Sequence, residues 1–162
     1  METAALILAA GDFDDTSLQP IGHGRKSKAL LPVGNKPQLF HTIELLEGVG
    51  FDKEAIFVAI EQDDLIEYEE NERIVPFESR LPARNMLKVK EPESSCDTLA
   101  DGLFKLSQLE DGLPQYILVI YVDILACGAL NTLAKFNRST DAAFISVYGP
   151  NRQTFRKGLS FA

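Results

Sequence analysis

Short uninterrupted apolar runs alternate along this chain with segments of helical periodicity, and this alternation constrains the fold more than any other feature. The first run, residues 4–10, contains only Ala, Leu and Ile and ends at Gly11. A run of this length without polar alternation, stopped by glycine, is typical of a strand buried on both faces in a parallel sheet. Further strands are predicted at residues 55–60, 86–90, 116–122 and 142–147.

The segments between these runs carry apolar residues at helical spacing. Pro37 suits the first turn of a helix, and Leu39, Ile43 and Leu46 then recur on one helical face before Gly50. Strands that alternate with helices predict an α/β fold, a three-layer sandwich around a mostly parallel sheet, formed by residues 1–162 as one domain. Helices are also predicted over residues 62–72, over a stripe of Leu99, Leu103 and Leu106 that follows capping serines, and over residues 131–137.

The charge balance excludes one class of partner. The formal net charge is −8, whereas a nucleic-acid-binding surface needs clustered Lys and Arg, so no direct nucleic-acid partner is expected. Much of the acidity lies in residues 61–72, which predicts either a solvated helix face or a docking surface for a basic partner.

Cysteine usage and hydropathy predict the compartment. Cys96 and Cys127 lie far apart and match no metal-binding spacing, so we interpret both as free thiols in a reducing environment. The first residues lack the basic flank of a signal peptide, and no apolar run approaches the length of a membrane span. A cytoplasmic protein without a membrane partner is therefore expected.

Three loops far apart in the sequence are predicted to meet. Right-handed crossovers place the carboxyl ends of parallel strands at one edge of the sheet, where such folds bind ligands. Gly11, Ser95 and Asp123 each follow a predicted strand. The Gly11 loop can offer N–H groups to phosphates, Lys28 can neutralise them, and Asp123 can hold a divalent metal. Each also has a plain structural interpretation, as a turn glycine, a solvated lysine and a turn-capping aspartate.

In order and spacing, residues 8–11, 28–37, 94–99 and 122–123 resemble the nucleotidyltransferase family, which joins sugar phosphates to nucleoside triphosphates. The resemblance implies a nucleotidyltransferase-like, Rossmann-like fold. It also implies that Lys28 contacts the substrate, that the loop containing Ser95 lies over the base, and that Asp123 binds magnesium.

The chain departs from that family at both nucleotide-binding loops. Asp12-Phe13-Asp14-Asp15 stands where the family has a glycine-rich loop with an arginine, and Ser94-Ser95-Cys96 replaces Gly-Thr-Ala. Two like charges 4 Å apart repel by about 4 kcal/mol at an effective dielectric constant near 20, so these carboxylates oppose a triphosphate. Side chains in place of glycine also crowd the approach of a nucleotide. The pattern predicts that the chain keeps the fold of this family but that its nucleotide-binding loop has lost the residues needed for activity.

Residues 31–37, 45–51 and 123–125 are similar to the gamma subunits of the eukaryotic guanine-nucleotide exchange factor for the translation-initiation GTPase. This resemblance implies a non-catalytic domain without a cofactor. The domain would pair with a paralogous domain in the catalytic subunit, alongside the other exchange-factor subunits, and lie near the GTPase. The left-handed β-helix domain that usually follows is missing, so residues 1–162 are expected to be the N-terminal part of such a subunit.

Two other functions remain open at this point. The first is an active transferase similar to mannose-phosphate guanylyltransferases, using Lys28 and Asp123 with Mg²⁺. The second is a regulatory module that binds a nucleotide or sugar nucleotide without turnover, through Gly11, Lys28, Ser95 and Asp123. In the scaffold interpretation, apolar surface that a sister domain would cover predicts that the isolated chain forms homodimers.

Overall fold

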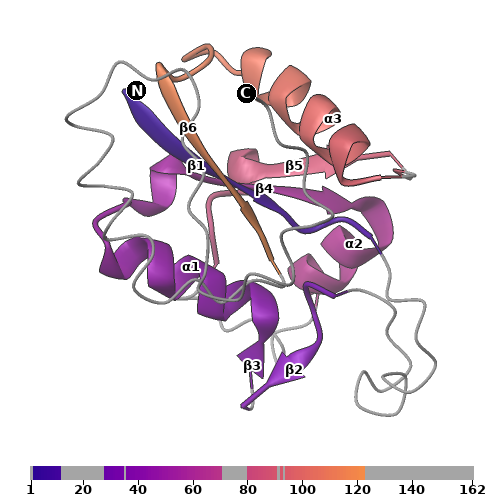
Figure 1. The fold of residues 1–162 in the computed structure, drawn as a ribbon. Coiled ribbons are helices and arrows are strands. Elements are labelled where there is room, and N and C mark those ends of the chain that lie inside the picture. The colour runs from indigo at the N-terminus through magenta and orange to yellow at the C-terminus, as the bar shows by residue number, and fades with distance from the viewer. Residues whose placement is uncertain are drawn as a thin grey trace, which may run out of the picture. The chain divides into compact units, whose positions relative to one another are not determined.

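The computed structural model describes residues 2–11, 28–34, 36–70, 80–90, 92 and 94–122, all of which belong to one compact unit, Met1–Leu125. A four-stranded parallel sheet forms its centre, in the order β5-β4-β1-β6 (Figure 1). The predicted α/β class is therefore confirmed. The strands are β1 (Thr3–Leu8), β4 (Ile56–Glu61), β5 (Met86–Val89) and β6 (Tyr116–Tyr121).

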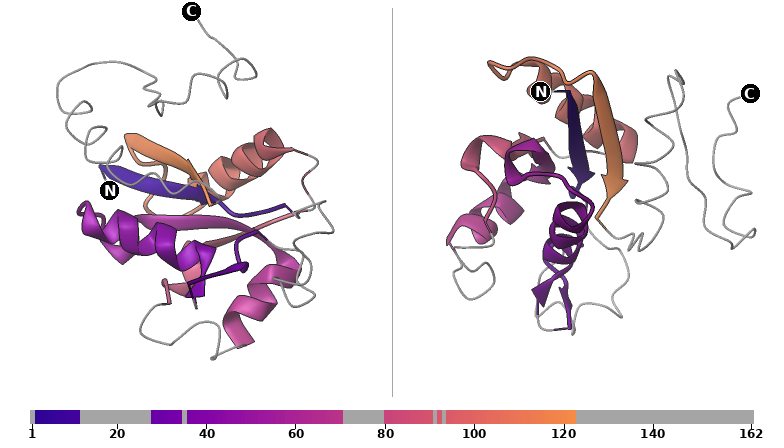
Figure 2. Two further views of the ribbon diagram at one scale, coloured as in Figure 1. Left: turned by 60° about the horizontal axis from the view of Figure 1, so that its bottom comes forward. Right: turned by 90° about the vertical axis from the view of Figure 1, so that its left-hand side faces the viewer.

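Helices cover both faces of the sheet, as a Rossmann-like sandwich requires. Helices α1 (Gln38–Gly48) and α2 (Gln62–Glu70) lie on one face, and α3 (Ser95–Ser107) lies on the other (Figures 1 and 2). The chain moves outward from β1 to β4 to β5 and then returns past β1 to β6. Because crossovers are right-handed, reversing the direction moves the connecting helix to the opposite face. The carboxyl ends of β1 and β6 therefore flank the point where the strand order reverses.

The core is built on the two central strands. Residues 4–8 of β1 and 56–60 of β4 are buried, which explains why both segments lack polar alternation. On the α3 face, Leu6 and Ala59 pack beneath Gly102 of the helix. A Cβ on Gly102 would lie 3.2 Å from the Ala59 Cβ, so the glycine permits this close packing. The predicted stripe on α3 is partly correct: Leu106 is fully buried, while Leu99 and Leu103 pack at the margin of the core.

Several boundaries differ from the predicted ones. Helix α1 begins one residue after Pro37, because Pro37 pairs with Pro32 in a small antiparallel hairpin that periodicity does not reveal. This hairpin consists of β2 (Pro32–Val33) and β3 (Lys36–Pro37). Two 3₁₀ helices, η2 (Lys53–Ala55) and η4 (Ala83–Asn85), were also not predicted. The predicted elements at residues 131–137 and 142–147 lie outside the described residues.

The two 3₁₀ helices are joined by one buried side chain. The Asn85 Nδ2 donates hydrogen bonds to the carbonyl oxygens of Lys53, Glu54 and Ile56, at 2.8, 3.1 and 2.8 Å. These bonds tie the start of β5 to the start of β4, at the amino edge of the sheet. None of the helices in the described part of the chain is long and apolar enough to cross a lipid bilayer.

Candidate functional site

The carboxyl edge of the sheet is the candidate site, because the strand order reverses there. Gly11 follows β1, Val122 follows β6, and Ser94 and Ser95 open α3 after β5. All three strands run parallel, so these residues lie at one edge, as the sequence predicts. Neighbouring strands are about 4.8 Å apart, so the end of β5 lies roughly two strand spacings from the end of β1. Asp123 directly follows Val122 but lies outside the described residues.

The backbone N–H of Gly11, to which the sequence interpretation assigns a phosphate, already has an anionic partner. It donates a 3.0 Å hydrogen bond to the Glu61 Oε1. Glu61 is the last residue of β4, the strand beside β1, and its side chain is half-buried. Sequence reasoning missed Glu61 as a site residue. A signal was present, because a carboxylate that ends the apolar strand 56–60 must lie at the carboxyl edge of a parallel sheet.

Lys28 is held near the first turn of α1. The carbonyl of the next residue, Ala29, accepts a hydrogen bond from the Leu39 N–H, and the Leu31 carbonyl accepts one from the Gln38 N–H, both at 2.9 Å. Ala29 and Leu30 are buried, so this turn is packed into the protein. The Lys28 backbone is therefore fixed at the end of α1 that faces the carboxyl edge.

Two buried polar side chains of α1 hold the end of β6. The Val122 carbonyl accepts hydrogen bonds from the Gln38 Nε2 at 3.1 Å and the Thr42 Oγ1 at 3.3 Å. The Val122 N–H in turn donates to the Leu8 carbonyl at 3.1 Å. The backbone is thus anchored to both α1 and β1 immediately before Asp123. Gln38 and Thr42 were also missed, although they are polar residues placed next to the apolar stripe of α1.

Lys36, the second lysine of the turn, has a structural role. Its Nζ lies 2.6 Å from the Glu44 Oε1, in the second turn of α1. His41, on the same helix, contacts the Val33 carbonyl through Nε2 at 2.7 Å. Both contacts fasten the β2–β3 hairpin to α1. The ammonium group of Lys36 is thus paired with a carboxylate of α1.

The N-terminus of α3 is capped by its own residues. The Asp97 N–H donates to the Ser94 Oγ at 3.3 Å, and the Ser94 hydroxyl donates to the Asp97 Oδ2 at 2.8 Å. Ser94 is therefore the N-cap that the sequence predicts. The Asp97 carboxylate satisfies the preference of a helix N-terminus for negative charge. Ser95 and Cys96 are exposed, and Cys96 is a free thiol as predicted; Cys127 lies outside the described residues.

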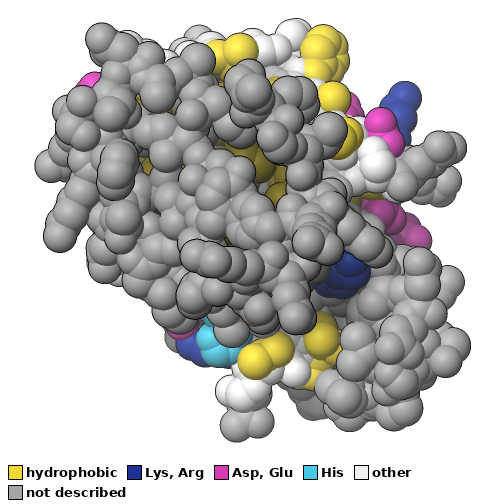
Figure 3. All heavy atoms as spheres, in the orientation of Figure 1, with side chains coloured by type: hydrophobic (Ala, Val, Ile, Leu, Met, Phe, Trp, Pro, Cys, Tyr) yellow, Lys and Arg dark blue, Asp and Glu magenta, His cyan; other side chains and the backbone are white. Residues whose placement is uncertain are grey.

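The described part of this edge carries two carboxylates, alongside Lys28 near the start of α1 and Lys90 just after β5. The Glu61 carboxylate meets the β1 turn, and the Asp97 carboxylate stands at the start of α3. On the face shown in Figure 3, the described Lys and Arg side chains lie apart from one another and form no basic patch. Among the described residues, no group of three or more His, Cys, Asp or Glu side chains is arranged to hold a metal ion.

Comparisons with known proteins add no assignment. No protein-family model matches the chain, and no curated protein or solved structure is significantly similar to it.

Proposed function

We propose that this chain is a non-catalytic, nucleotidyltransferase-like domain of the guanine-nucleotide exchange factor that acts on the translation-initiation GTPase. In this role it assembles with a paralogous domain of the catalytic subunit and with the other exchange-factor subunits in the cytoplasm. The sequence resemblance described above supports the identity of the partners. The Rossmann-like sandwich is the architecture that the resemblance requires.

The contact between Gly11 and Glu61 is the observation that favours a scaffold over an enzyme. A transferase of this fold needs the N–H groups after β1 for the triphosphate, and it stabilises negative charge that develops there. In this chain the Gly11 N–H is bonded to a carboxylate. Asp12, Asp14 and Asp15 follow directly in the sequence and add more negative charge. An assembly domain tolerates this arrangement because it turns over no substrate.

Co-expression with the other exchange-factor subunits tests the proposal. The chain, tagged, is expected to co-purify with the paralogous catalytic subunit in a fixed stoichiometry that survives gel filtration. Alone, it is expected to leave the rate of GDP release from the GTPase unchanged. Recovery of the chain without any of these subunits, under conditions in which they assemble with one another, would refute the proposed partners.

An active nucleotidyltransferase is the second candidate, and one observation favours it. Gln38 and Thr42 anchor the end of β6 just before Asp123, which is the kind of support that a metal-binding aspartate needs. Pyrophosphate release from nucleoside triphosphate and sugar phosphate, with Mg²⁺, tests this function. Turnover that is lost in both Lys28→Ala and Asp123→Ala would establish it and remove the scaffold interpretation.

A further inference from the structure

We propose that Glu61 is a resident anion that closes the turn after β1 to phosphate, and that removing its charge opens this turn to polyphosphate. The Gly11 turn is then a latent anion site, and the Glu61 carboxylate is the group that occupies it. Because this proposal concerns anion binding alone, it stands even if the chain has other partners than those proposed above.

The backbone geometry gives the site its shape. Gly11 has a φ of +112°, a conformation that residues with a Cβ rarely adopt, and a Cβ built on it would meet no atom within 4 Å. Two residues earlier in the chain, the Ala9 N–H still donates to the Ala59 carbonyl of β4 at 2.9 Å. The chain therefore leaves the sheet between Ala9 and Gly11, and the Gly11 N–H turns toward the end of β4 instead of continuing the ladder.

Glu61 is placed to meet that N–H by the register of the sheet. Leu8 pairs with Ala59, so Glu61 lies two residues beyond the last position of β4 that pairs with β1, beside the turn. Its Oε1 accepts the Gly11 N–H at 3.0 Å. A hydrogen bond with an ionised acceptor is stronger than one between neutral groups, so the contact competes well with solvent.

A phosphate oxygen and the Glu61 carboxylate need the same place. Both are anionic acceptors for the same N–H. Two negative groups that are both within hydrogen-bonding reach of one N–H repel each other strongly in a half-buried environment. The Glu61 carboxylate therefore excludes phosphate in two ways, by occupying the donor and by its charge. Glu61→Gln removes the charge and leaves a neutral amide oxygen of the same size. Its hydrogen bond from the Gly11 N–H is weaker than that of a carboxylate, so a phosphate oxygen can displace it without a change in the fold of the turn.

Calorimetric titration of the full chain with inorganic tripolyphosphate, in the presence of Mg²⁺, tests the proposal. The Mg²⁺ offsets the charge of the carboxylates that follow Gly11 in the sequence. The wild-type chain is expected to show no saturable binding, and Glu61→Gln is expected to bind at least tenfold more tightly. The matched control is Glu54→Gln, which makes the same change in net charge on an exposed side chain at the amino edge of the sheet. It is expected to behave as wild type.

A second measurement keeps the test independent of how well the variant folds. With ¹⁵N-glycine labelling, the amide resonance of Gly11 in the wild-type chain is expected to stay in place when tripolyphosphate is added. In Glu61→Gln the same resonance is expected to shift in proportion to the bound fraction. The proposal is overturned if tripolyphosphate shifts the wild-type Gly11 resonance, or if Glu61→Gln and Glu54→Gln bind the probe equally.

Discussion

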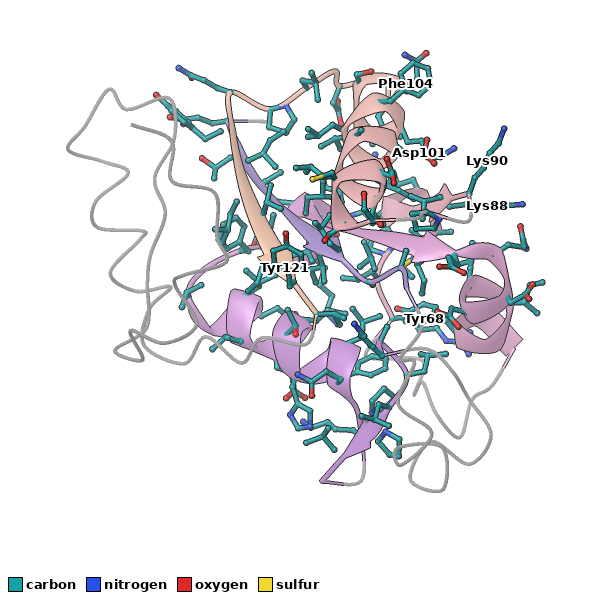
Figure 4. The ribbon with its side chains drawn as sticks, turned by 45° about the vertical axis from the view of Figure 1, so that its right-hand side comes forward. Tyr68, Lys88, Lys90, Asp101, Phe104 and Tyr121 are labelled. Atoms are coloured by element: carbon teal, nitrogen blue, oxygen red, sulfur yellow. The ribbon has the colours of Figure 1, made fainter. Side chains whose placement is uncertain are left out.

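The two outer strands of the described sheet, β5 and β6, differ in length, charge and exposure. Strand β5 has four residues and carries the exposed Lys88, with Lys90 just beyond its end. Figure 4 shows these two lysines extending outward beside Asp101, whose Oδ2 accepts the Lys90 N–H at 3.1 Å. Strand β6 has six residues, Tyr-Ile-Leu-Val-Ile-Tyr, and carries no charge.

The contrast matters because an outer strand is a template for pairing with another chain. Short length and exposed lysines are two devices by which proteins prevent such pairing, and β5 has both. Strand β6 has neither, and its Val119 and Tyr121 side chains are 38% and 44% exposed. The comparison teaches that the β5 side of the sheet is built to face solvent, whereas the β6 side is built to be covered.

The largest effect is expected when one leucine on each strand is replaced by alanine and the two losses of folding stability are compared. Leu87→Ala on β5 removes a buried side chain and is expected to lower the free energy of unfolding by about 2–5 kcal/mol. Leu118→Ala on β6 removes a half-buried one and should cost about half as much or less, because less apolar area is lost. Urea denaturation measures both. Equal losses would show that β6 is as enclosed in solution as β5.

A smaller effect is expected where α1 holds the end of β6. Gln38→Ala removes one hydrogen bond to the buried Val122 carbonyl and is expected to cost about 1–2 kcal/mol. Amide exchange at Val122 should accelerate, since its own bond to Leu8 then lies at a looser strand end. Gln108→Ala, at the exposed C-cap of α3, is the control and should leave both quantities unchanged. Unchanged exchange in Gln38→Ala would show that β6 does not depend on this anchor.

Self-association should respond in opposite directions to charge changes on the two strands. The wild-type chain is expected to associate at high concentration, and Val119→Lys on β6 to shift its dissociation constant at least tenfold toward monomer. Lys88→Val on β5 removes a protecting charge and should increase association. Light scattering over a concentration series measures all three. A monomeric wild type would remove the interpretation of β6 as a surface to be covered.

The smallest effect is expected for an exposed ion pair beside β5. Lys105 lies 4.0 Å from Asp101 at the (i, i+4) spacing of α3, and both side chains are about one-third exposed. Lys105→Gln is expected to cost about 0.3–0.5 kcal/mol, and less at high salt. A loss above about 1 kcal/mol, measured by the same urea titration, would show that charge stabilises this side of the sheet instead of only protecting its edge.

Much of the fold follows from local patterns in the sequence. The unbroken apolar runs of β1 and β4 require burial on both faces, and the serine before α3 predicts its N-cap. The hairpin at residues 32–37 was missed, because it has two residues in each strand and no hydrophobic period to read. The lower burial of β6 was missed as well, since an apolar run has the same appearance in a central strand and in an outer one.

By itself, then, the sequence determined the α/β class, the strands and helices of the described core, and the edge at which Gly11, Ser95 and the end of β6 lie. Only the tertiary structure decided which groups meet there. Gly11 and Glu61 are 50 residues apart, and Gln38 and Val122 are 84 apart. Local patterns depend on near neighbours along the chain, but these contacts depend on strand order. With β4 on one side of β1 and β6 on the other, the Glu61 carboxylate comes to occupy the turn that follows β1.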